Sequence, residues 1–431
     1  MQPTPVRLAA ALAVAAASLE AQAAGFALIE QNASGLGNAY AGQAAAAYDA
    51  STVFFNPAGM TRLGGPQIVL SGHLIKPRAE FRDNGSTAAP LQTLGGNGGD
   101  AGGVGFVPNL YYTHPVNDRL TLGIGINAPF GLKTEYDADW VGRFLAVNSK
   151  VESINVNPAL AVKLNDTVSV GLGIDYQKLD ATLTNMVNYS AAIAGGGGPI
   201  VPGLQGLATV KGDDWGWGWN AGLMADLGAT RIGVNYRSEI DYTLAGSVSF
   251  GNRPAALAAA LPDGPVTAKT TMPASASLSV FHALSPTVDL LADLTWTGWS
   301  SFDKLAIVRT SGALVGATPE NWDDTLRYSV GINYKPGGAW TWRAGIAYDE
   351  TPVPDRYRTP RIPDQNRTWL ALGGQFRIDR ANAVDFGYAH LFVPNADMSA
   401  SVNNTAPGAG VLRGEYDNAV DILSAQYTHT F

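Results

Sequence analysis

Strict alternation of apolar residues with small or polar ones is the dominant pattern along this chain. Between residues 120 and 127, leucine and isoleucine occupy the even positions, while threonine, glycine and asparagine occupy the odd ones. The same period of two recurs over residues 168–177, 328–335 and 342–349. A period of two places alternate side chains on opposite faces of a β-strand, so these segments predict strands with one apolar face.

About fourteen segments bounded by turn residues fit this pattern, an even count as closed single-chain bacterial barrels require. They span residues 67–82, 104–116, 119–129, 151–165, 167–184, 208–228, 229–250, 267–283, 286–310, 323–336, 339–350, 367–378, 382–397 and 412–431. Past the N-terminal region, no apolar run approaches the roughly 20 residues of a membrane-spanning helix. The pattern therefore predicts an all-β antiparallel barrel.

The connections between these segments alternate in length, which is a second sign of a barrel. Short connections rich in turn residues lie at 117–118, 165–166, 285–286, 336–338 and 379–380. Long connections lie at 132–150, 195–206, 252–265, 351–366 and 394–410. Membrane barrels have short periplasmic turns and long extracellular loops, so we expect the two sets at opposite ends.

Aromatic residues near the predicted strand ends distinguish a membrane barrel from a soluble β-sandwich. Seven of these residues are expected to form girdles at the headgroup level, since amphipathic rings favour that depth. They are Tyr176, Trp296, Trp299, Tyr334, Trp340, Trp342 and Tyr348. The last segment also alternates and ends on Phe431, as suits insertion into an outer membrane.

The first residues have the features of a secretory signal peptide. Arg7 precedes the apolar run from Leu8 to Leu19, and Ala21-Gln22-Ala23 supplies a small-residue cleavage site. We predict a signal peptide over residues 1–23 and a mature chain that begins at Ala24. Together with the barrel pattern, this places the protein in the outer membrane of a Gram-negative cell, as a multi-pass β-barrel.

Composition narrows the classes of function. The net charge is −8 with no basic cluster, so nucleic acid is not an expected partner. The histidines lie singly along the chain, at His73, His114, His282, His390 and His429. They form no pair at metal-ligand spacing, and no positioned nucleophile and base are indicated. We expect neither an enzyme nor a metal site nor a cofactor.

Residues 24–66 do not alternate and precede the first predicted strand. A barrel of about fourteen strands, residues 67–431, encloses a lumen that needs a plug if it is not to leak. This small-residue segment is expected to be that plug, an N-terminal hatch. Within it, Asn56 can hydrogen-bond the neighbouring backbone and Pro57 fixes φ, so Asn56-Pro57-Ala58 predicts a stiff turn. Such a turn suits either a gate or a simple cap.

Several short motifs resemble the FadL-type family of outer-membrane long-chain fatty-acid transporters, which also includes aromatic-hydrocarbon transporters. The resemblance covers nearly the whole chain. The motifs are Ala24-Gly25-Phe26, Gly35-Leu36-Gly37, Asn56-Pro57-Ala58, Trp140-Val141-Gly142-Arg143, Thr297-Gly298-Trp299-Ser300, Pro352-Val353-Pro354-Asp355, Arg361-Ile362-Pro363-Asp364 and Arg367-Thr368-Trp369.

The resemblance implies passive uptake of hydrophobic small molecules, long-chain fatty acids foremost, through a plugged barrel. It also implies a lateral opening at an inward kink of the third strand, which by position falls among Gly123, Gly125, Pro129 and Phe130. Glycine and proline suit a kink, although the two glycines could equally face a crowded lumen. Uptake of aromatic or alkane hydrocarbons and general porin diffusion are the alternatives. We expect a monomer whose partners are its hydrophobic substrate and outer-membrane lipid.

Arginines and carboxylates crowd the segment from Asp349 to Arg367. One interpretation is a charge network among Arg356, Arg358, Arg361, Arg367 and the nearby acids that holds an extracellular loop. The other is that Arg358 or Arg361 binds a substrate carboxylate, since the guanidinium fork matches that group. The sequence leaves both open.

Overall fold

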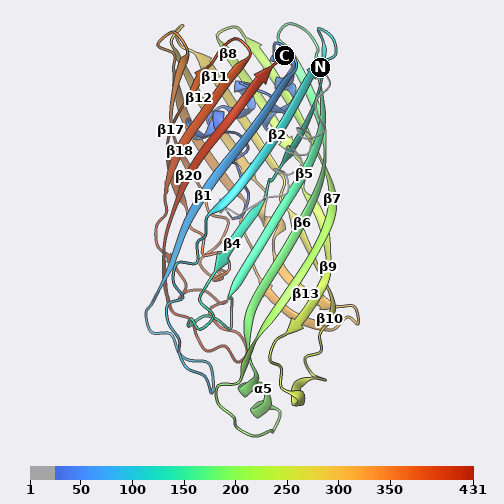
Figure 1. Cartoon of the computed structure of the whole chain (residues 1–431), viewed down its shortest axis with the longest axis vertical. Helices are drawn as coiled ribbons and strands as arrows, with labels where there is room; N and C mark the ends of the chain where they lie inside the picture. The colour runs from blue at the N-terminus through green and yellow to red at the C-terminus, as the bar shows by residue number, and fades with distance from the viewer. Residues whose placement is uncertain (1–24) are drawn as a thin grey trace.

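The computed structural model describes residues 25–431, which form one closed β-barrel with a folded segment inside it (Figure 1). The predicted signal peptide, residues 1–23, and Ala24 lie outside the described residues. No helix in the described part of the chain is long and apolar enough to cross a membrane.

The barrel wall is a single antiparallel sheet. Its strands are β1 (Gln67–Asp83), β2 (Gly105–Pro115), β3 (Leu120–Asn127), β4 (Gly131–Glu135), β5 (Asn148–Lys163), β6 (Val168–Asn188), β7 (Gln205–Leu227), β8 (Thr230–Arg237), β9 (Ile240–Phe250), β10 (Gly264–Met272), β11 (Ser275–Ala283), β12 (Val288–Thr297), β13 (Lys304–Arg309), β14 (Leu314–Pro319), β15 (Thr325–Tyr334), β16 (Trp340–Asp349), β17 (Arg367–Arg377), β18 (Asn382–Phe392), β19 (Ala396–Asp397) and β20 (Gly414–Thr430).

These strands make fourteen crossings of the wall, which we call staves. Six staves are interrupted and consist of two strands each: β3 with β4, β8 with β9, β10 with β11, β12 with β13, β14 with β15, and β18 with β19. Neighbours in sequence are neighbours in the wall, and β1 pairs with β20 from Gln67↔Thr430 to Asp83↔Gly414 to close it. The predicted segments correspond one to one with the staves, so the barrel prediction is confirmed.

The two ends of the barrel differ as the connection lengths predict. The short turns lie at the end where the C-terminus lies, at the top of Figure 1. The long loops and helix α5 (Tyr189–Gly195) lie at the other end. The loop predicted from residue 132 is shorter than expected, because residues 131–135 form β4 on the edge of β5. Two 3-10 turns, η2 (Ala255–Leu257) and η3 (Trp299–Ser301), complete the long-loop half.

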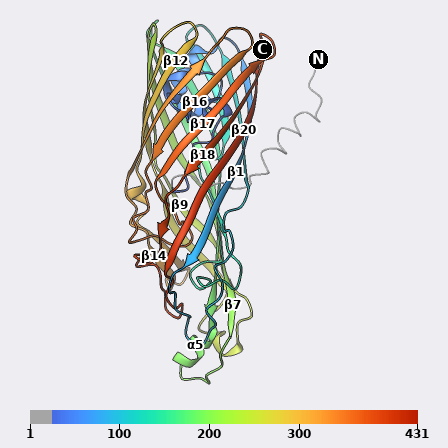
Figure 2. The same cartoon turned by 90° about the vertical axis from the view of Figure 1, so that its left-hand side faces the viewer.

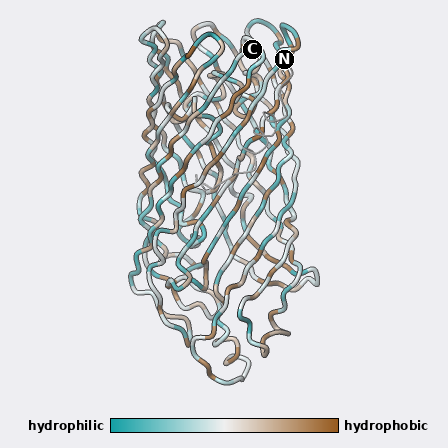
Figure 3. The backbone as a smooth tube through the Cα atoms, in the orientation of Figure 1, coloured by the Kyte–Doolittle hydropathy of each residue, from teal (hydrophilic) through white to brown (hydrophobic). Residues whose placement is uncertain are grey.

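Alternation along the staves separates an apolar outer face from a polar lumen, visible as changing colour along each strand in Figure 3. Leu172 and Ile174 are more than half exposed on the outside, whereas Asp175 between Ile174 and Tyr176 is fully buried. Outward apolar side chains suit contact with lipid. Trp340 and Trp342 lie on this outer face, stacked 5.0 Å apart.

The prediction is wrong for one of the girdle residues. Trp299 is 1% exposed and lies inside the barrel, in η3, where its ring is 4.8 Å from that of Phe26. The alternation of β12 stops at Thr297, so period two no longer fixes which way the next side chains point. Trp299 is therefore not an interface residue.

The hatch, here residues 25–66, lies inside the half of the barrel with the short turns, as the blue segment of Figures 1 and 2 shows. It contains α2 (Ala33–Leu36), α3 (Gln43–Ala46), α4 (Thr52–Phe55) and η1 (Pro57–Arg62). All four are short and none is amphipathic over several turns. They are held by contacts with the wall rather than by helix propensity.

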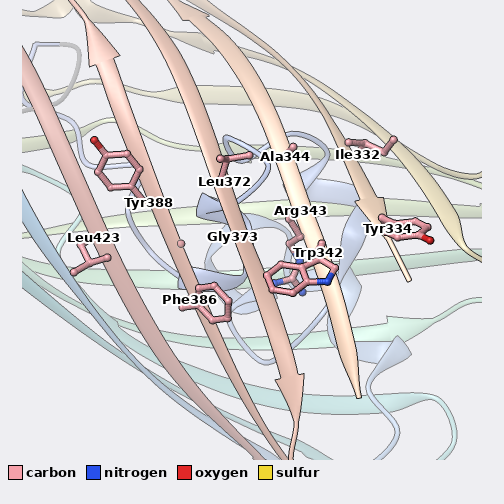
Figure 4. A pocket seen from close by; sticks show the side chains of 11 residues that line it. Ile332, Tyr334, Trp342, Arg343, Ala344, Leu372, Gly373, Phe386, Tyr388 and Leu423 are labelled. Atoms are coloured by element: carbon pink, nitrogen blue, oxygen red, sulfur yellow. The ribbon is translucent and has the colours of Figure 1, made fainter. Parts of the chain in front are cut away.

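A shallow depression of about 500 Å³ lies on the outside of the wall. It crosses the middle of β15 to β18 and is lined by outward apolar side chains, among them Trp342, Phe386 and Tyr388 (Figure 4). Its location on the lipid-facing side, away from the lumen, separates it from the transport path considered below.

Candidate functional site

The Asn56-Pro57-Ala58 turn fixes the hatch to the wall. Asn56 is fully buried, and its Nδ2 donates to the backbone carbonyls of Ala44, 2.6 Å away, and Leu223 on β7, 3.0 Å away. Its Oδ1 accepts from the amide of Ala58 at 3.1 Å, which caps η1 with Pro57 in the first position. The turn is thus stiff, as predicted, and its asparagine also bonds β7.

Glycines on the lumen face of the wall make room for this turn. Gly171 on β6 and Gly222 on β7 are directly paired. A Cβ at Gly222 would lie 1.9 Å from Oδ1 of Asn56, and one at Gly171 would lie 2.4 Å from the amide nitrogen of Ala58. Only residues without a side chain allow this approach, so the hatch backbone at Ala58 and the side chain of Asn56 pack directly on the backbone of the wall.

The third stave is broken at residues 128–130. Pairing between β2 and β3 ends at Leu110↔Ile126, and β4 pairs with β5 alone. The other half of β2, residues 105–109, pairs with β1 and with no strand on its other side. The wall therefore has a gap between β2 and β4.

The start of the hatch borders this gap. The amide of Leu28 donates to the carbonyl of Pro129 at 2.8 Å, and the amide of Gly131 donates to the carbonyl of Phe26 at 2.9 Å. Ala27 and Phe130 form an antiparallel bridge. The interrupted stave thus recovers backbone hydrogen bonds from the N-terminal residues of the hatch.

The predicted kink residues fall into two groups. Pro129 and Phe130 lie in the break itself. Gly123 and Gly125 lie within β3, paired on both sides, and a Cβ on them would meet Met60 and Tyr111 respectively. The two glycines therefore face a crowded lumen, one of the two readings that the sequence allowed.

A cavity of about 140 Å³ lies inside the barrel beside the break. Its lining comes from the hatch at Ala27, Leu28 and Ile29, from the break at Pro129 and Phe130, and from the walls of β8, β11, β12 and β15. The cavity therefore lies between the hatch, the break in the third stave and the opposite wall.

Five aromatic rings form a cluster that reaches this cavity through Phe130 and Trp299. Phe26 packs edge-on against Phe130, Trp299, Phe302 and Trp322, with ring centroids 4.8 to 6.1 Å apart. All five side chains are less than 9% exposed. Such a group offers an apolar surface that suits a hydrocarbon chain.

The cavity also contains two arginines that sequence reasoning did not single out. Arg237 is engaged, since it pairs with Asp175 and donates to the carbonyl of Phe54 at 3.1 Å. Arg327 on β15 donates from Nη2 to the carbonyl of Ala39 at 2.9 Å, while its Nε and Nη1 have no partner among the described residues. Alternation places Arg327 on the lumen face, but many lumen residues are charged, so the pattern alone does not distinguish it.

The two arginines predicted as carboxylate ligands are already bonded to the protein. Arg358 is fully buried and donates to the carbonyls of Asp364 and Asp397 and to the carboxylate of Asp355. Arg361 donates to the carbonyls of Asn148, Thr184 and Leu145 and to the Ser149 hydroxyl, and burial lowers its pKa to about 10. Both arginines fasten the long loops to one another, in line with the charge-network interpretation.

A buried acid in the adjoining loop belongs to the same region. Glu320 is 4% exposed, and its Oε2 accepts from Nε1 of Trp322 at 3.2 Å. Burial raises the pKa of Glu320 to about 8. Its carboxyl group therefore holds a proton at neutral pH.

Among residues 25–431, no group of three or more histidines, aspartates and glutamates is arranged to hold a metal ion.

Comparison with known proteins identifies relatives of this chain. The family model for outer membrane protein transport proteins (OMPP1/FadL/TodX) matches residues 14–431. The long-chain fatty acid transport protein of Salmonella typhi is 31% identical over 401 residues, covering 89% of this chain and 91% of the relative. Outer membrane protein P1 of Haemophilus influenzae is 32% identical, covering 89% of each chain.

Solved structures agree with these relatives. A Pseudomonas aeruginosa FadL homologue superposes with a TM-score of 0.86 at 27% identity, covering 95% of this chain and all of that one. The toluene transporter TbuX of Ralstonia pickettii shares the fold, with a TM-score of 0.65 at 21% identity over 89% of this chain and 94% of its own. The chain therefore belongs to the OMPP1/FadL/TodX family of outer-membrane transport proteins.

Proposed function

We propose that this protein takes up hydrophobic small molecules across the outer membrane, foremost long-chain fatty acids. A substrate enters between the long loops, rests in the cavity beside Phe26 and leaves sideways through the gap between β2 and β4. The names of the most similar curated relatives support this substrate class, since several are long-chain fatty acid transport proteins at 30 to 31% identity.

Arg327 is the observation that carries the choice of an acidic substrate. Arg327 is 6% exposed, it lines the cavity together with Arg237 and Asp349, and its Nε and Nη1 lack a protein acceptor. A buried donor without a partner costs about 1–3 kcal/mol, and more when charged, so this site favours an anionic ligand. A carboxylate on Arg327 with its chain against Phe130 and Trp299 satisfies both parts of the cavity.

The gap supplies an exit that suits the chemistry of such a substrate. An apolar chain gains about 25 cal/mol for each Å² removed from water, and release into the periplasm would return that energy as a barrier. Departure into lipid retains it. Pro129 and Phe130 line both the cavity and the break, so the lateral path is short, and Asn56, Pro57 and Ala58 keep the direct path through the hatch closed.

The alternatives require other features of the lumen. Aromatic and alkane hydrocarbons carry no acceptor for the unpaired donors of Arg327. A general porin requires an open lumen at the place that the hatch occupies. We also infer that the protein performs no catalysis. We infer too that it works as a monomer surrounded by outer-membrane lipid, because each stave pairs with a neighbour on both sides over at least part of its length.

A competition series with an Arg327→Gln variant tests the proposal. Cells importing labelled oleate are challenged with toluene, an alkane or unlabelled oleate. We expect oleate to compete best, and Arg327→Gln to weaken oleate binding about tenfold or more, as for loss of a charge-assisted hydrogen bond. Preferential competition by toluene or the alkane, or full oleate affinity in the variant, would overturn the choice of fatty acids. Large steady single-channel currents would instead identify a porin.

A further inference from the structure

We propose that Glu30 is the proton carrier of this transport path. It takes up a proton when a substrate carboxylate binds Arg327, and returns that proton to the substrate as the molecule leaves through the wall gap. This inference rests on the proposed function and adds a role for a hatch residue outside the motifs discussed above.

Glu30 lies at the rim of the gap. Its backbone carbonyl accepts from Nδ2 of Asn109 at 3.0 Å, and Asn109 is the β2 residue next to the last pair with β3. The preceding residue, Ile29, lines the cavity. The backbone of Glu30 therefore lies beside the gap, and its carboxyl group lies within electrostatic reach of Arg327, which lines the cavity.

The side chain of Glu30 is buried without a hydrogen bond to another residue. It is 0% exposed, and neither Oε1 nor Oε2 is bonded to any other described residue, while its own backbone amide favours the ionised form. Buried carboxyl groups are normally paired or hydrogen-bonded, because an unpaired one is costly. A buried carboxyl group with no bond to another side chain is suited to changing its protonation state rather than to holding the fold.

The charged groups around Glu30 come from three staves. Arg327 on β15 and Arg367 on β17 act on it electrostatically, as does Asp349 on β16 with the opposite sign. Arg367 already pairs with Asp364, and the hydroxyl of the neighbouring hatch residue Tyr40 donates to the carbonyl of Asn32. Arg327 and Arg367 each keep a donor without a partner, but only Arg327 of the two lines the cavity, so Arg327 is the cation whose donors Glu30 and a substrate carboxylate would share.

Burial raises the pKa of Glu30 to about 7, with Arg327 and Arg367 opposing the rise. Glu30 belongs to the hatch rather than to a membrane-spanning strand. A group with this pKa gains and loses a proton readily near neutral pH.

The protonation steps balance as follows. An ionised fatty acid enters beside ionised Glu30 and Arg327, and with Asp349 and the Arg367–Asp364 pair close by, the buried site then holds more carboxyl groups than guanidinium groups. Glu30 then takes one proton from a hydronium ion of the solvent, which leaves as water, and Arg327 turns to the substrate carboxylate. At exit the O–H bond of Glu30 breaks, the proton passes to the substrate carboxylate, and a neutral carboxylic acid enters the lipid. Glu30 returns to its ionised state beside Arg327, and no charge is carried into hydrocarbon.

Proton uptake on binding is the first test. Oleate binding to the purified full-length protein is measured by calorimetry at pH 8 in two buffers of different ionisation enthalpy. We expect the wild type to take up about one proton for each oleate bound, and Glu30→Gln to take up none. Equal proton uptake in the two proteins would assign the proton to another group and overturn the proposal.

Transport of matched substrates is the second test. We expect Glu30→Gln to slow oleate uptake about tenfold or more, because the bound anion lacks its proton donor, and to leave uptake of oleyl alcohol unchanged. Glu30→Asp, which keeps a carboxyl group, should restore part of the oleate uptake. An equal loss for oleate and oleyl alcohol would mean that Glu30 only supports the hatch, and would overturn the proposal.

Glu350→Gln is the control variant. Its carboxylate accepts from the amide of Leu326 at 2.9 Å, a bond that glutamine also makes, and it should behave as the wild type in both assays. Failure of the proposed function gives a different pattern: the wild type would bind no oleate, or Arg327→Gln would bind it fully. Either result also removes the basis for a proton on Glu30.

Discussion

Asn56 of the hatch donates a hydrogen bond from its side-chain amide to the backbone carbonyl of Leu223 on β7, 3.0 Å away. The same nitrogen bonds Ala44 within the hatch. This one side chain thus links two parts of the hatch and also links the hatch to the wall. Its loss should weaken both connections.

Asn56→Ala should lower uptake of a hydrophobic substrate without preventing barrel assembly. Removing the amide leaves two buried carbonyls unpaired, at about 1–3 kcal/mol each, which is enough to loosen the hatch but small beside the barrel. Uptake by whole cells at equal surface expression measures the effect, and heat modifiability on a gel reports assembly. Unchanged uptake would contradict a gating role for the turn.

Gly222→Ala should push the hatch off its position. The new Cβ would lie 1.9 Å from Oδ1 of Asn56, and the paired strand β6 limits any retreat of the wall. We expect higher single-channel conductance in planar bilayers, since a displaced plug opens the lumen. Gly316→Ala in β14 is the control, because a Cβ there meets nothing within 4 Å. Identical conductance in the two variants would show that the hatch tolerates the contact.

Labelling at the break tests the lateral exit. The chain has no cysteine, so Pro129→Cys gives a single reactive site that lines the cavity beside the gap. A bulky thiol reagent should abolish oleate uptake by this variant, and leave uptake unaffected when the cysteine replaces Gly316. If labelled Pro129→Cys still transports at the unlabelled rate, the substrate leaves by another route.

Glu320 makes its loop sensitive to pH. The pKa of this buried carboxyl is raised from 4.5 to about 8, so between these values the folded loop keeps a proton that the unfolded chain has lost. Stability contributed by the loop therefore falls as pH rises through this window, by at most about 5 kcal/mol. Hydrogen exchange in the loop, divided by the base-catalysed intrinsic rate at each pH, should show protection that falls from pH 5 to pH 8, and Glu320→Gln should remove this fall. The exposed Glu239→Gln variant should keep it.

The wall could be predicted closely because alternation is a local signal. Each stave repeats the same inward and outward order over eight or more residues, and the short turns punctuate it, so position and face follow from the residues alone. Trp299 was misplaced where that order ends: a 3-10 turn follows β12, and a tertiary contact with Phe26, far away in sequence, decides its direction.

The site was harder to predict because its parts are distant in sequence. Phe26, Pro129, Trp299 and Arg327 meet only through the register of the closed sheet and the depth at which the hatch lies. Arg358 and Arg361 stood out by density of charge, yet dense charge in a loop favours mutual pairing. No sequence motif pointed to Glu30, because its lack of a hydrogen bond to another residue exists only in the folded chain.

The bonds from Phe26 and Leu28 to the broken stave have a consequence for how the barrel is assembled. Unpaired backbone in hydrocarbon is costly, and an open sheet edge invites pairing with foreign strands. Here residues 26–28 of the hatch serve as a short donor strand for that edge. Since the hatch directly precedes β1, which closes against β20, we expect the hatch to occupy the lumen when the first and last strands join. A barrel that closed around an empty lumen would leave the broken edge without the hydrogen bonds from Phe26 and Leu28.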